Sequence, residues 1–417
     1  MSTETAIKNV GLSNTDVLVR MYDVGFGDCF LIAYKSGDKI KKILVDCGSI
    51  AKRKTAMGTT VKKLVEHVKD KNGKPRIDVV IATHRHKDHV SGFAKPEWNQ
   101  VEVGEVWLPW TENPNDPEAT RIRTAQASFA FALQNFLGFT DDSEDPDISD
   151  LTTAEILALN ALSNERAMNT LHHGFKNNPT RRFLPDDQNT SGRITDGNLI
   201  PEMVAHLLGP SKEEDVIRDM DPPSDQSYLA LDSNIQNGVS PSPFTVEWAL
   251  PEGQGVDRFP SFSEEDRDEL QKLNQGISED FAVALDKAVN GTSLMIMIEL
   301  KDKFLLLPGD AQWGTWNSVL KNNTARRLLS KTSFYKVGHH CSHNATPVEF
   351  IDKVLDQNNS DRVAMVSVRP RSQWKEIPRK PLITELKAKF SGFCRSDIES
   401  TQAGFDRVGN IYIDKIL

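Results

Sequence analysis

The sequence is poor in cysteine and contains no long apolar run. Four cysteines occur in 417 residues, and their wide scatter excludes both a disulfide framework and a C-x-x-C site. No segment reaches the roughly 18 consecutive apolar residues that a membrane-spanning helix needs. The polar segment Met1–Thr15 also lacks the apolar core of a signal peptide. We therefore expect a cytoplasmic protein in a reducing environment, with no membrane as partner.

An excess of positive charge is absent as well. The chain has 50 Lys and Arg against 59 Asp and Glu, which gives a formal net charge of −9. This balance argues against a protein that coats nucleic acid non-specifically, although it leaves room for a local basic cleft. With 38% hydrophobic residues, the chain can bury a large core in one big domain or two modest ones.

Metal-binding residue types are concentrated in the short segment His84–His89, which reads His-Arg-His-Lys-Asp-His and follows the apolar run Val79–Ala82. Three imidazoles and a carboxylate supply the nitrogen and oxygen donors that zinc, manganese or iron prefer. Where a strand enters a loop, His84 and His86 point to the same side, because side chains alternate along an extended chain. The segment therefore predicts a metal centre, and a histidine-rich surface loop is the less favoured interpretation.

Four further segments accompany this motif in order along the chain. The first is Asp-Val-Gly-Phe-Gly-Asp at Asp23–Asp28, and the second is an apolar strand followed by Asp-Cys-Gly at Ile43–Gly48. The third is an apolar strand followed by Pro-Gly-Asp at Leu305–Asp310, and the fourth is Lys-Val-Gly-His-His-Cys-Ser at Lys336–Ser342. With H-x-H-x-D-H, this set resembles the metallo-β-lactamase superfamily. Its opening segment resembles the branch of the soluble hydrolase domain of competence DNA-uptake proteins. The resemblance runs from about residue 17 to residue 370.

The resemblance implies a four-layer αββα sandwich, an α/β (α+β) fold, over residues 14–417. Apolar and alternating runs predict strands, and apolar residues at helical spacing predict a helix between two of them, at 60–71. A hairpin is expected at 293–307. The first thirteen or so residues look like a disordered lead-in. The strands are expected at 17–22, 29–34, 42–46, 78–82 and 103–110.

Two segments depart from the sandwich pattern and are interpreted as insertions. The first, at about 113–193, has helical periodicity at 124–137 and 152–171. It is expected to form a lid or a surface for a protein partner. The second, at about 211–290, is polar and proline-rich, with a helix expected at 263–273.

The resemblance also implies ligands for two divalent metal ions, zinc or manganese. His84 and His86 would hold the first ion, with Asp88 and His89 on the second. Asp310 would bridge both ions, because it follows an apolar strand and so lies at the rim of the sheet. Asp88 is also expected to act in catalysis, as the group that accepts a proton from the attacking water.

The adjacent His339 and His340 cannot both face one ion in an extended backbone. The resemblance assigns His339 as the last metal ligand and His340 as a catalytic residue that faces the substrate, although the reverse assignment stays open. Asp28 and Asp46 are interpreted as carboxylates that orient a ligand imidazole, or as strand-end turn residues. Cys341 stands where the family has glycine, as a small residue in a tight turn or as an extra soft ligand.

One ligand of the family pattern is missing. The branch usually places a histidine at a strand end between the first motif and the bridging aspartate, and here Gly209 occupies that position. His206 is three residues away, an odd offset that places it on the other face of a strand. His172 and His173 are the other candidates, more simply explained as helix-end or surface residues. The centre is therefore expected to be dinuclear with water at the gap, or mononuclear.

These observations predict a metal-dependent hydrolase, most simply a phosphodiesterase or nuclease whose substrate is a phosphodiester, nucleic acid or nucleotide. A basic run after residue 368, with an interleaved tryptophan, favours such a substrate. Two alternatives remain: hydrolysis of a lactam, lactone or thioester, and a non-catalytic protein that binds a partner through its helical insertion. Redox di-iron chemistry is the least favoured, since nothing indicates a flavin partner. The basic run comprises Arg369, Arg371, Lys375, Arg379 and Lys380, with Trp374 among them.

Overall fold

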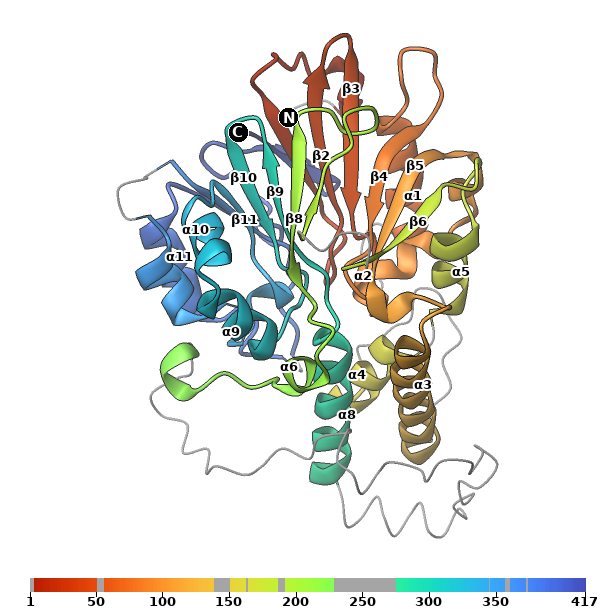
Figure 1. Ribbon diagram of the computed structural model, residues 1–417, viewed down its shortest axis with the longest axis vertical. Helices are drawn as coiled ribbons and strands as arrows, with labels where there is room; N and C mark the ends of the chain where they lie inside the picture. Colours follow the sequence, from red (N-terminus) through yellow and green to blue (C-terminus); the bar gives the residue numbers. More distant parts are fainter. Residues whose placement is uncertain are drawn as a thin grey trace.

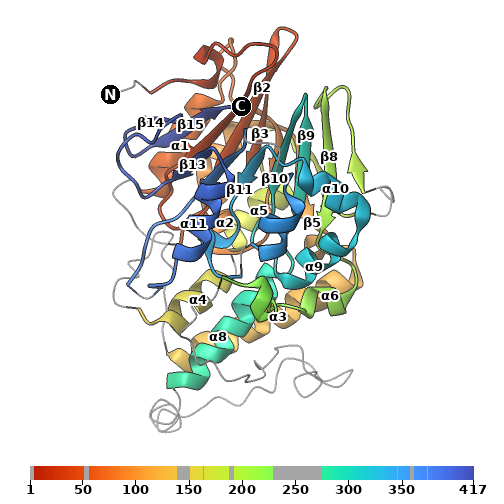
Figure 2. The ribbon, with the colours of Figure 1, turned by 90° about the vertical axis from the view of Figure 1, so that its left-hand side faces the viewer.

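Two β-sheets lie face to face, with helices on both outer faces (Figures 1 and 2). This arrangement confirms the predicted αββα sandwich. The computed structural model describes residues 4–50, 56–138, 151–162, 164–186, 192–228, 275–344, 346–356, 361–372 and 374–417.

The first sheet contains the first and the last described strands of the chain, β1 and β15. Its eight strands follow the order β14-β15-β1-β2-β3-β4-β5-β6, and β3 to β6 are parallel neighbours. The carboxyl ends of β3, β4 and β5 therefore meet at one edge. The strands are β1 (Val17–Tyr22), β2 (Phe30–Ser36), β3 (Lys39–Val45), β4 (Arg76–Ile81), β5 (Glu102–Pro109), β6 (Thr180–Leu184), β14 (Asp406–Val408) and β15 (Tyr412–Ile416).

The second sheet has seven strands in the order β13-β12-β11-β10-β9-β8-β7. Strands β10 to β13 are parallel, whereas the predicted hairpin is the antiparallel pair β9 and β10. Loops that carry the later sequence motifs leave the carboxyl ends of β10 and β11. The strands are β7 (Arg193–Ile194), β8 (Met203–Gly209), β9 (Met295–Leu300), β10 (Lys303–Leu307), β11 (Phe334–Lys336), β12 (Val363–Val366) and β13 (Gly392–Arg395).

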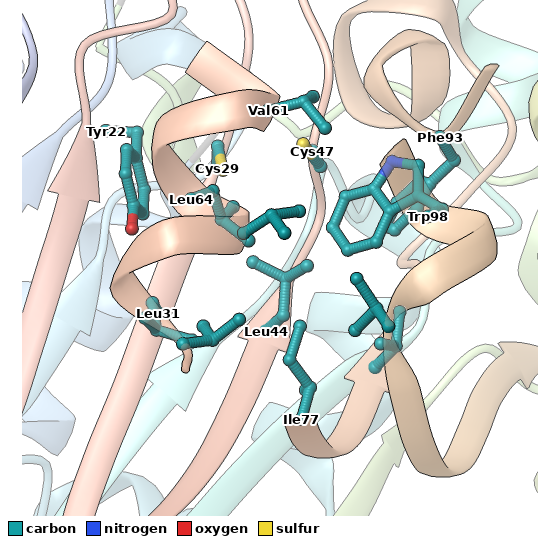
Figure 3. Close-up of a cluster of buried hydrophobic side chains, with 14 of the residues drawn as sticks. Tyr22, Cys29, Leu31, Leu44, Cys47, Val61, Leu64, Ile77, Phe93 and Trp98 are labelled. Carbon is teal, nitrogen blue, oxygen red and sulfur yellow. The ribbon is translucent and has the colours of Figure 1, made fainter. Parts of the chain in front are cut away.

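The helices cover the outer faces of both sheets, and helix α1 shows how. Its Val61 and Leu64 have helical spacing and point together at the sheet. Figure 3 shows them above Leu31 and Leu44, with Trp98 beside them. Each fully buried leucine of this kind contributes about 1.5–3 kcal/mol. The first sheet is covered by α1 (Met57–His67), α2 (Lys87–Val90) and α5 (Glu165–His173), and the second by α9 (Trp313–Lys321), α10 (Asn323–Ser330) and α11 (Lys380–Lys389).

Three further helices form a cap beyond the carboxyl ends of the strands, below the sheets in Figures 1 and 2. They are α3 (Pro117–Leu137), α4 (Thr153–Ala161) and α8 (Gln275–Asn290), and they pack together through small and apolar residues such as Ala158, Leu285 and Val289. The short helix α6 (Glu214–Arg218) packs against α9. The helix expected at 263–273 lies outside the described residues.

The prediction of a disordered lead-in is wrong for residues 4–13. Ile7 is fully buried in the core outside the first sheet. The backbone N–H of Thr5 donates to Tyr412 Oη at 2.8 Å, and Glu4 lies 3.0 Å from His67 Nε2. The sequence does not indicate this packing, because the segment has too few apolar residues to form a helical or strand pattern, and the residues it contacts lie far along the chain.

His67 is expected to make the fold less stable as the pH falls from about 6.5 toward 4. Burial lowers the pKa of His67 to about 4. The unfolded chain therefore takes up a proton that the folded chain excludes, at about 1.4 kcal/mol for each pKa unit. Urea unfolding of the wild type and His67→Gln at pH 7 and pH 5 tests this point. The variant should lose less stability between the two pH values, and an equal loss would contradict the prediction.

Candidate metal centre

The His84–His89 segment leaves the end of β4 and is fixed there by Asp46, which follows β3. The Thr83 backbone N–H donates to Asp46 Oδ1 at 2.7 Å, and the Thr83 hydroxyl donates to Oδ2 at 2.8 Å. His89 Nδ1 also lies 2.8 Å from Asp46 Oδ2. Asp46 thus sets both the course of the loop and the orientation of one imidazole, as metal-bound histidines usually require.

Buried histidines and aspartates gather in groups in which the donor atoms lie within 4.8 Å of one another. The first group contains His84, His86 and Asp88, and the second contains Asp88, His89, Asp310 and His340. Asp88 belongs to both. These loops start from both sheets, so the site lies where the carboxyl ends of β4, β10 and β11 converge.

In the first group, His84 and His86 aim nitrogen atoms at each other. His84 Nε2 lies 3.1 Å from His86 Nδ1. Burial, together with His89 and His86, holds the pKa of His84 well below its usual range, and burial lowers the pKa of His86 to about 4. Both imidazoles are therefore neutral near pH 7, which is the state that binds a metal ion.

In the second group, each carboxylate meets an imidazole. His89 Nε2 lies 3.2 Å from Asp310 Oδ2, and His340 Nε2 lies 2.8 Å from Asp88 Oδ2. Burial alone would raise the pKa of Asp88. The charge of His89 and the hydrogen bond with His340 outweigh burial and hold this pKa below its ordinary value. Asp88 Oδ1 is buried without a hydrogen-bond partner. Although burial opposes it, Asp310 and Asp88 raise the pKa of His89, and Asp88 and Asp28 raise the pKa of His340. These imidazoles therefore carry the positive charge that a divalent cation beside the unpaired carboxylate oxygen would replace.

The structure brings His340, and not His339, into the second group. His340 Nδ1 bonds to the carbonyl oxygen of Ser367 at 2.9 Å, which fixes the ring with Nε2 toward Asp88. The side chain of His339 instead contacts the Ser342 hydroxyl at 3.1 Å. The extended backbone assumed from the sequence is not present, because His339, His340 and Cys341 have φ angles of 42°, 50° and 67°. Three consecutive left-handed residues form a strained turn of the kind that functional sites retain.

Cys341 lies in the core outside the second sheet and belongs to none of the donor groups found among the described residues. Burial raises the pKa of its thiol to about 12, so it stays protonated. These observations favour the tight-turn interpretation over the soft-ligand one. Arg85, between the two histidines, points away and forms a paired contact with Glu112, with Nε 3.0 Å from Oε1.

Lys336 is a site residue to which the sequence analysis gave no role. Its ammonium contacts Asp28 and lies 3.6 Å from Asp310 Oδ1. Although burial opposes it, Asp28 and Asp310 raise the pKa of Lys336, so the group stays charged. Its charge lies between Asp28 and Asp310, and Asp310 is a member of the second donor group. Its position at the start of the Lys-Val-Gly-His-His segment was the only available signal.

At the strand end where the resemblance implies a histidine, Thr315 leaves no room for a side chain on Gly209. A side chain at Gly209 would place its Cβ 2.4 Å from the Thr315 methyl group. His206 points elsewhere, with Nε2 2.8 Å from Glu299 Oε2. His172 lies 3.8 Å from Glu112, outside the donor groups of the described chain. None of these histidines takes the place of the strand-end histidine that the sequence resemblance implies.

Asp286 of α8 was missed by the sequence analysis. Its Oδ1 lies 3.9 Å from His86 Nδ1, and its Oδ2 lies 4.0 Å from His339 Nε2. Burial, together with Asp88 and Asp310, raises the pKa of Asp286 to about 8. An aspartate within an otherwise apolar helix face was the available signal, but the helix lies outside every motif.

Asp46→Asn is expected to weaken metal binding by about 10–100-fold, the usual effect of losing a partner that orients a ligand imidazole. The amide keeps the shape of the side chain but removes the charge beside His89 Nδ1. Competition with a chromogenic chelator measures the affinity. Asp302→Asn, at a side chain that is 76% exposed, is the matched control and should leave it unchanged. Equal affinities of the Asp46 variant and the wild type would exclude this role.

No protein-family model matches the sequence, and no curated protein matches it. Among solved structures, the chain is similar to the metallo-β-lactamase fold protein YhfI from Bacillus subtilis, with 11% identity and a TM-score of 0.36 over 91% of this chain and 95% of that chain. This likeness concerns the fold alone, and the chemistry discussed below depends on the side chains of the site. Among the described helices, none is long and apolar enough to cross a membrane.

Proposed function

We propose that this protein is a metal-dependent phosphodiesterase or nuclease, with two divalent ions, zinc or manganese, at the site. One observation carries the proposal: the buried carboxylate of Asp88 belongs to both donor groups and has an unpaired oxygen. A carboxylate shared in this way suits two neighbouring cations better than a structural hydrogen-bond network. His84 and His86 would hold one ion, and His89, Asp310 and His340 the other, with Asp88 near both.

Two bound ions would supply Lewis-acid charge and a hydroxide near neutral pH, because cations lower the pKa of water from about 15.7 toward 7. Asp88, which belongs to both donor groups, would accept the proton of the attacking water as well as bind metal. His339, whose ring is partly exposed at 18%, would face the substrate. Burial lowers the pKa of His339, so it would assist the leaving group by a hydrogen bond from its neutral imidazole N–H. This assignment reverses the roles that the sequence gave to the two adjacent histidines.

Aromatic side chains beside the site favour a nucleotide or nucleic acid as the phosphodiester. The ring of Phe26 lies 4.2 Å from that of His340, and the ring of Trp374 lies 4.6 Å from that of Phe26. Phe26 is buried and packs with Trp374, so the partly buried Trp374, from the basic run after β12, is the ring of the two that can reach a base beside the cations of that run. The resemblance of Asp23–Asp28 to the competence DNA-uptake branch supports the same substrate class.

A panel of chromogenic substrates tests the reaction class. Purified protein with added Mn²⁺ or Zn²⁺ should hydrolyse bis-p-nitrophenyl phosphate, and single-stranded and double-stranded DNA and RNA would follow. Lactone, lactam and thioester substrates should be turned over far more slowly. Faster turnover of a carbonyl substrate would move the proposal to the carbonyl hydrolases. Bound metal without turnover of any substrate would favour a partner-binding protein.

A further inference from the structure

The short helix α2 carries Asp88 within the ligand loop, His84–His89, and it begins without a cap of its own. An N-cap side chain normally accepts a hydrogen bond from the second or third backbone N–H of its helix. Here the N-cap residue is His86, whose side chain makes no such bond. Its ring instead faces His84, with the two nitrogen atoms 3.1 Å apart. The backbone N–H of Asp88, the second of the helix, therefore needs an acceptor from another element.

Asn160 of α4, a helix of the cap, supplies that acceptor. Its Oδ1 accepts from the backbone N–H of Asp88 at 3.2 Å. This contact fixes the orientation of the amide, because a backbone N–H can only donate. The NH₂ group of Asn160 therefore faces its other hydrogen-bond partner, the carboxylate of Asp286. Asn160 is only 5% exposed and both ends of its amide are bonded, so its side chain is held in one orientation.

A second amide holds the same loop on the other side of His86. Asn164, which follows α4, donates its Nδ2 hydrogen to the carbonyl oxygen of Arg85 at 2.7 Å. It is the N-cap residue of α5, yet its side chain makes no capping bond in that helix. The two amides thus hold the backbone of the ligand loop before and after His86.

Apolar contacts keep α4 in place above the loop. Ile156 and Leu159 of α4 pack in one cluster with Phe26 of the sandwich. Ala158, on another face of the helix, packs in the cluster that α4 shares with α3 and α8. Helix α4 therefore contacts both α2 and α8, as the two views of the ribbon show (Figures 1 and 2).

We propose that Asn160 and Asn164 are positioning residues of the ligand loop, with Asn160 acting on Asp88. The inference deepens the proposed function and rests on it, because Asp88 is the carboxylate that both donor groups share. It makes the inserted helix α4 part of the metal centre. Loss of a partner that orients a metal ligand usually lowers metal affinity by about 10–100-fold.

The test begins with two variants of the full chain. In Asn160→Leu, the leucine fills a similar volume but can neither accept from Asp88 nor donate to Asp286. Asn164→Ala removes the bond to Arg85 at a half-buried position. Its effect cannot come from an uncapped α5, because the Asn164 side chain makes no bond to that helix.

Gln126→Leu is the matched control. Gln126 is a buried amide of the cap, and it joins α3 to α8 by donating its Nε2 hydrogen to the carbonyl oxygen of Ala288 at 3.2 Å. Its loss should lower the free energy of unfolding, because a buried acceptor is left unpaired. Metal affinity by chelator competition, the visible spectrum of the Co²⁺ form and urea unfolding are measured for each protein.

Metal affinity should fall about 10–100-fold in Asn160→Leu, with a changed Co²⁺ spectrum, and by a smaller factor in Asn164→Ala. Gln126→Leu should keep the wild-type affinity and spectrum. Wild-type values in Asn160→Leu, or in Asn164→Ala if the leucine variant does not fold, would overturn the inference alone. An equal loss of affinity in Gln126→Leu would do the same, because the cause would then be a loosened cap. A wild type that binds no ion would instead overturn the proposed function.

Discussion

Asp88→Asn should lower kcat/KM for phosphodiester hydrolysis by about 10²–10⁴-fold. The amide fills the same space, so packing around the site is kept. It removes the charge shared by the two donor groups and the oxygen that takes the proton of the attacking water. Steady-state kinetics on bis-p-nitrophenyl phosphate at saturating metal measure the loss.

Asp78→Asn is the matched control for this variant. Asp78 is a buried carboxylate on β4, the strand that precedes the His84–His89 segment, but it pairs with Lys41 at 3.2 Å, away from the donor groups. Its loss should lower stability without a comparable fall in kcat/KM, because removing one member of a buried pair leaves an uncompensated charge. Wild-type kinetics in Asp88→Asn would exclude Asp88 from the reaction.

His340→Gln should lose one of two bound ions and most of the activity, whereas His339→Gln should keep both ions. The reason is the position of the two rings. His340 Nε2 lies 2.8 Å from Asp88 Oδ2 inside the second group, and its other nitrogen is fixed by Ser367. His339 lies at the edge, beside Asp286 and Ser342.

Elemental analysis of the two variants, purified in parallel, separates these roles. Loss of a direct ligand should weaken binding of the second ion more than the about 10–100-fold expected for an orienting residue. His339→Gln should mainly lower kcat, with its largest effect on substrates that have poor leaving groups. The opposite order, with metal lost only in His339→Gln, would restore the assignment made from the sequence.

Much of the fold could be predicted because the signals are local. Apolar runs predicted β1 to β5 and the hairpin of β9 and β10, and helical spacing predicted α1. The order of the motifs predicted which loops converge. The packing of Ile7 could not be predicted, since single apolar residues show no period and their partners lie far along the chain.

The donor set was predictable in composition but not in detail. His84, His86, Asp88, His89 and Asp310 do gather, because short motifs at strand ends bring them to one edge. The choice between the two adjacent histidines depended on backbone angles that no residue pattern reveals, since non-glycine residues rarely adopt positive φ. Asp286 could not be predicted as a site residue for another reason, because tertiary packing alone brings its helix to the site.

The central claim is that this cluster is a working two-metal centre, and its most direct test is the metal content of the wild type measured together with turnover. Protein stripped with chelator and reloaded with Mn²⁺ or Zn²⁺ is analysed for metal per chain and assayed on bis-p-nitrophenyl phosphate. The account predicts about two ions per chain, with turnover that rises as the second ion binds. A chain that stays empty after reloading, or fills without any phosphodiester turnover, would contradict it.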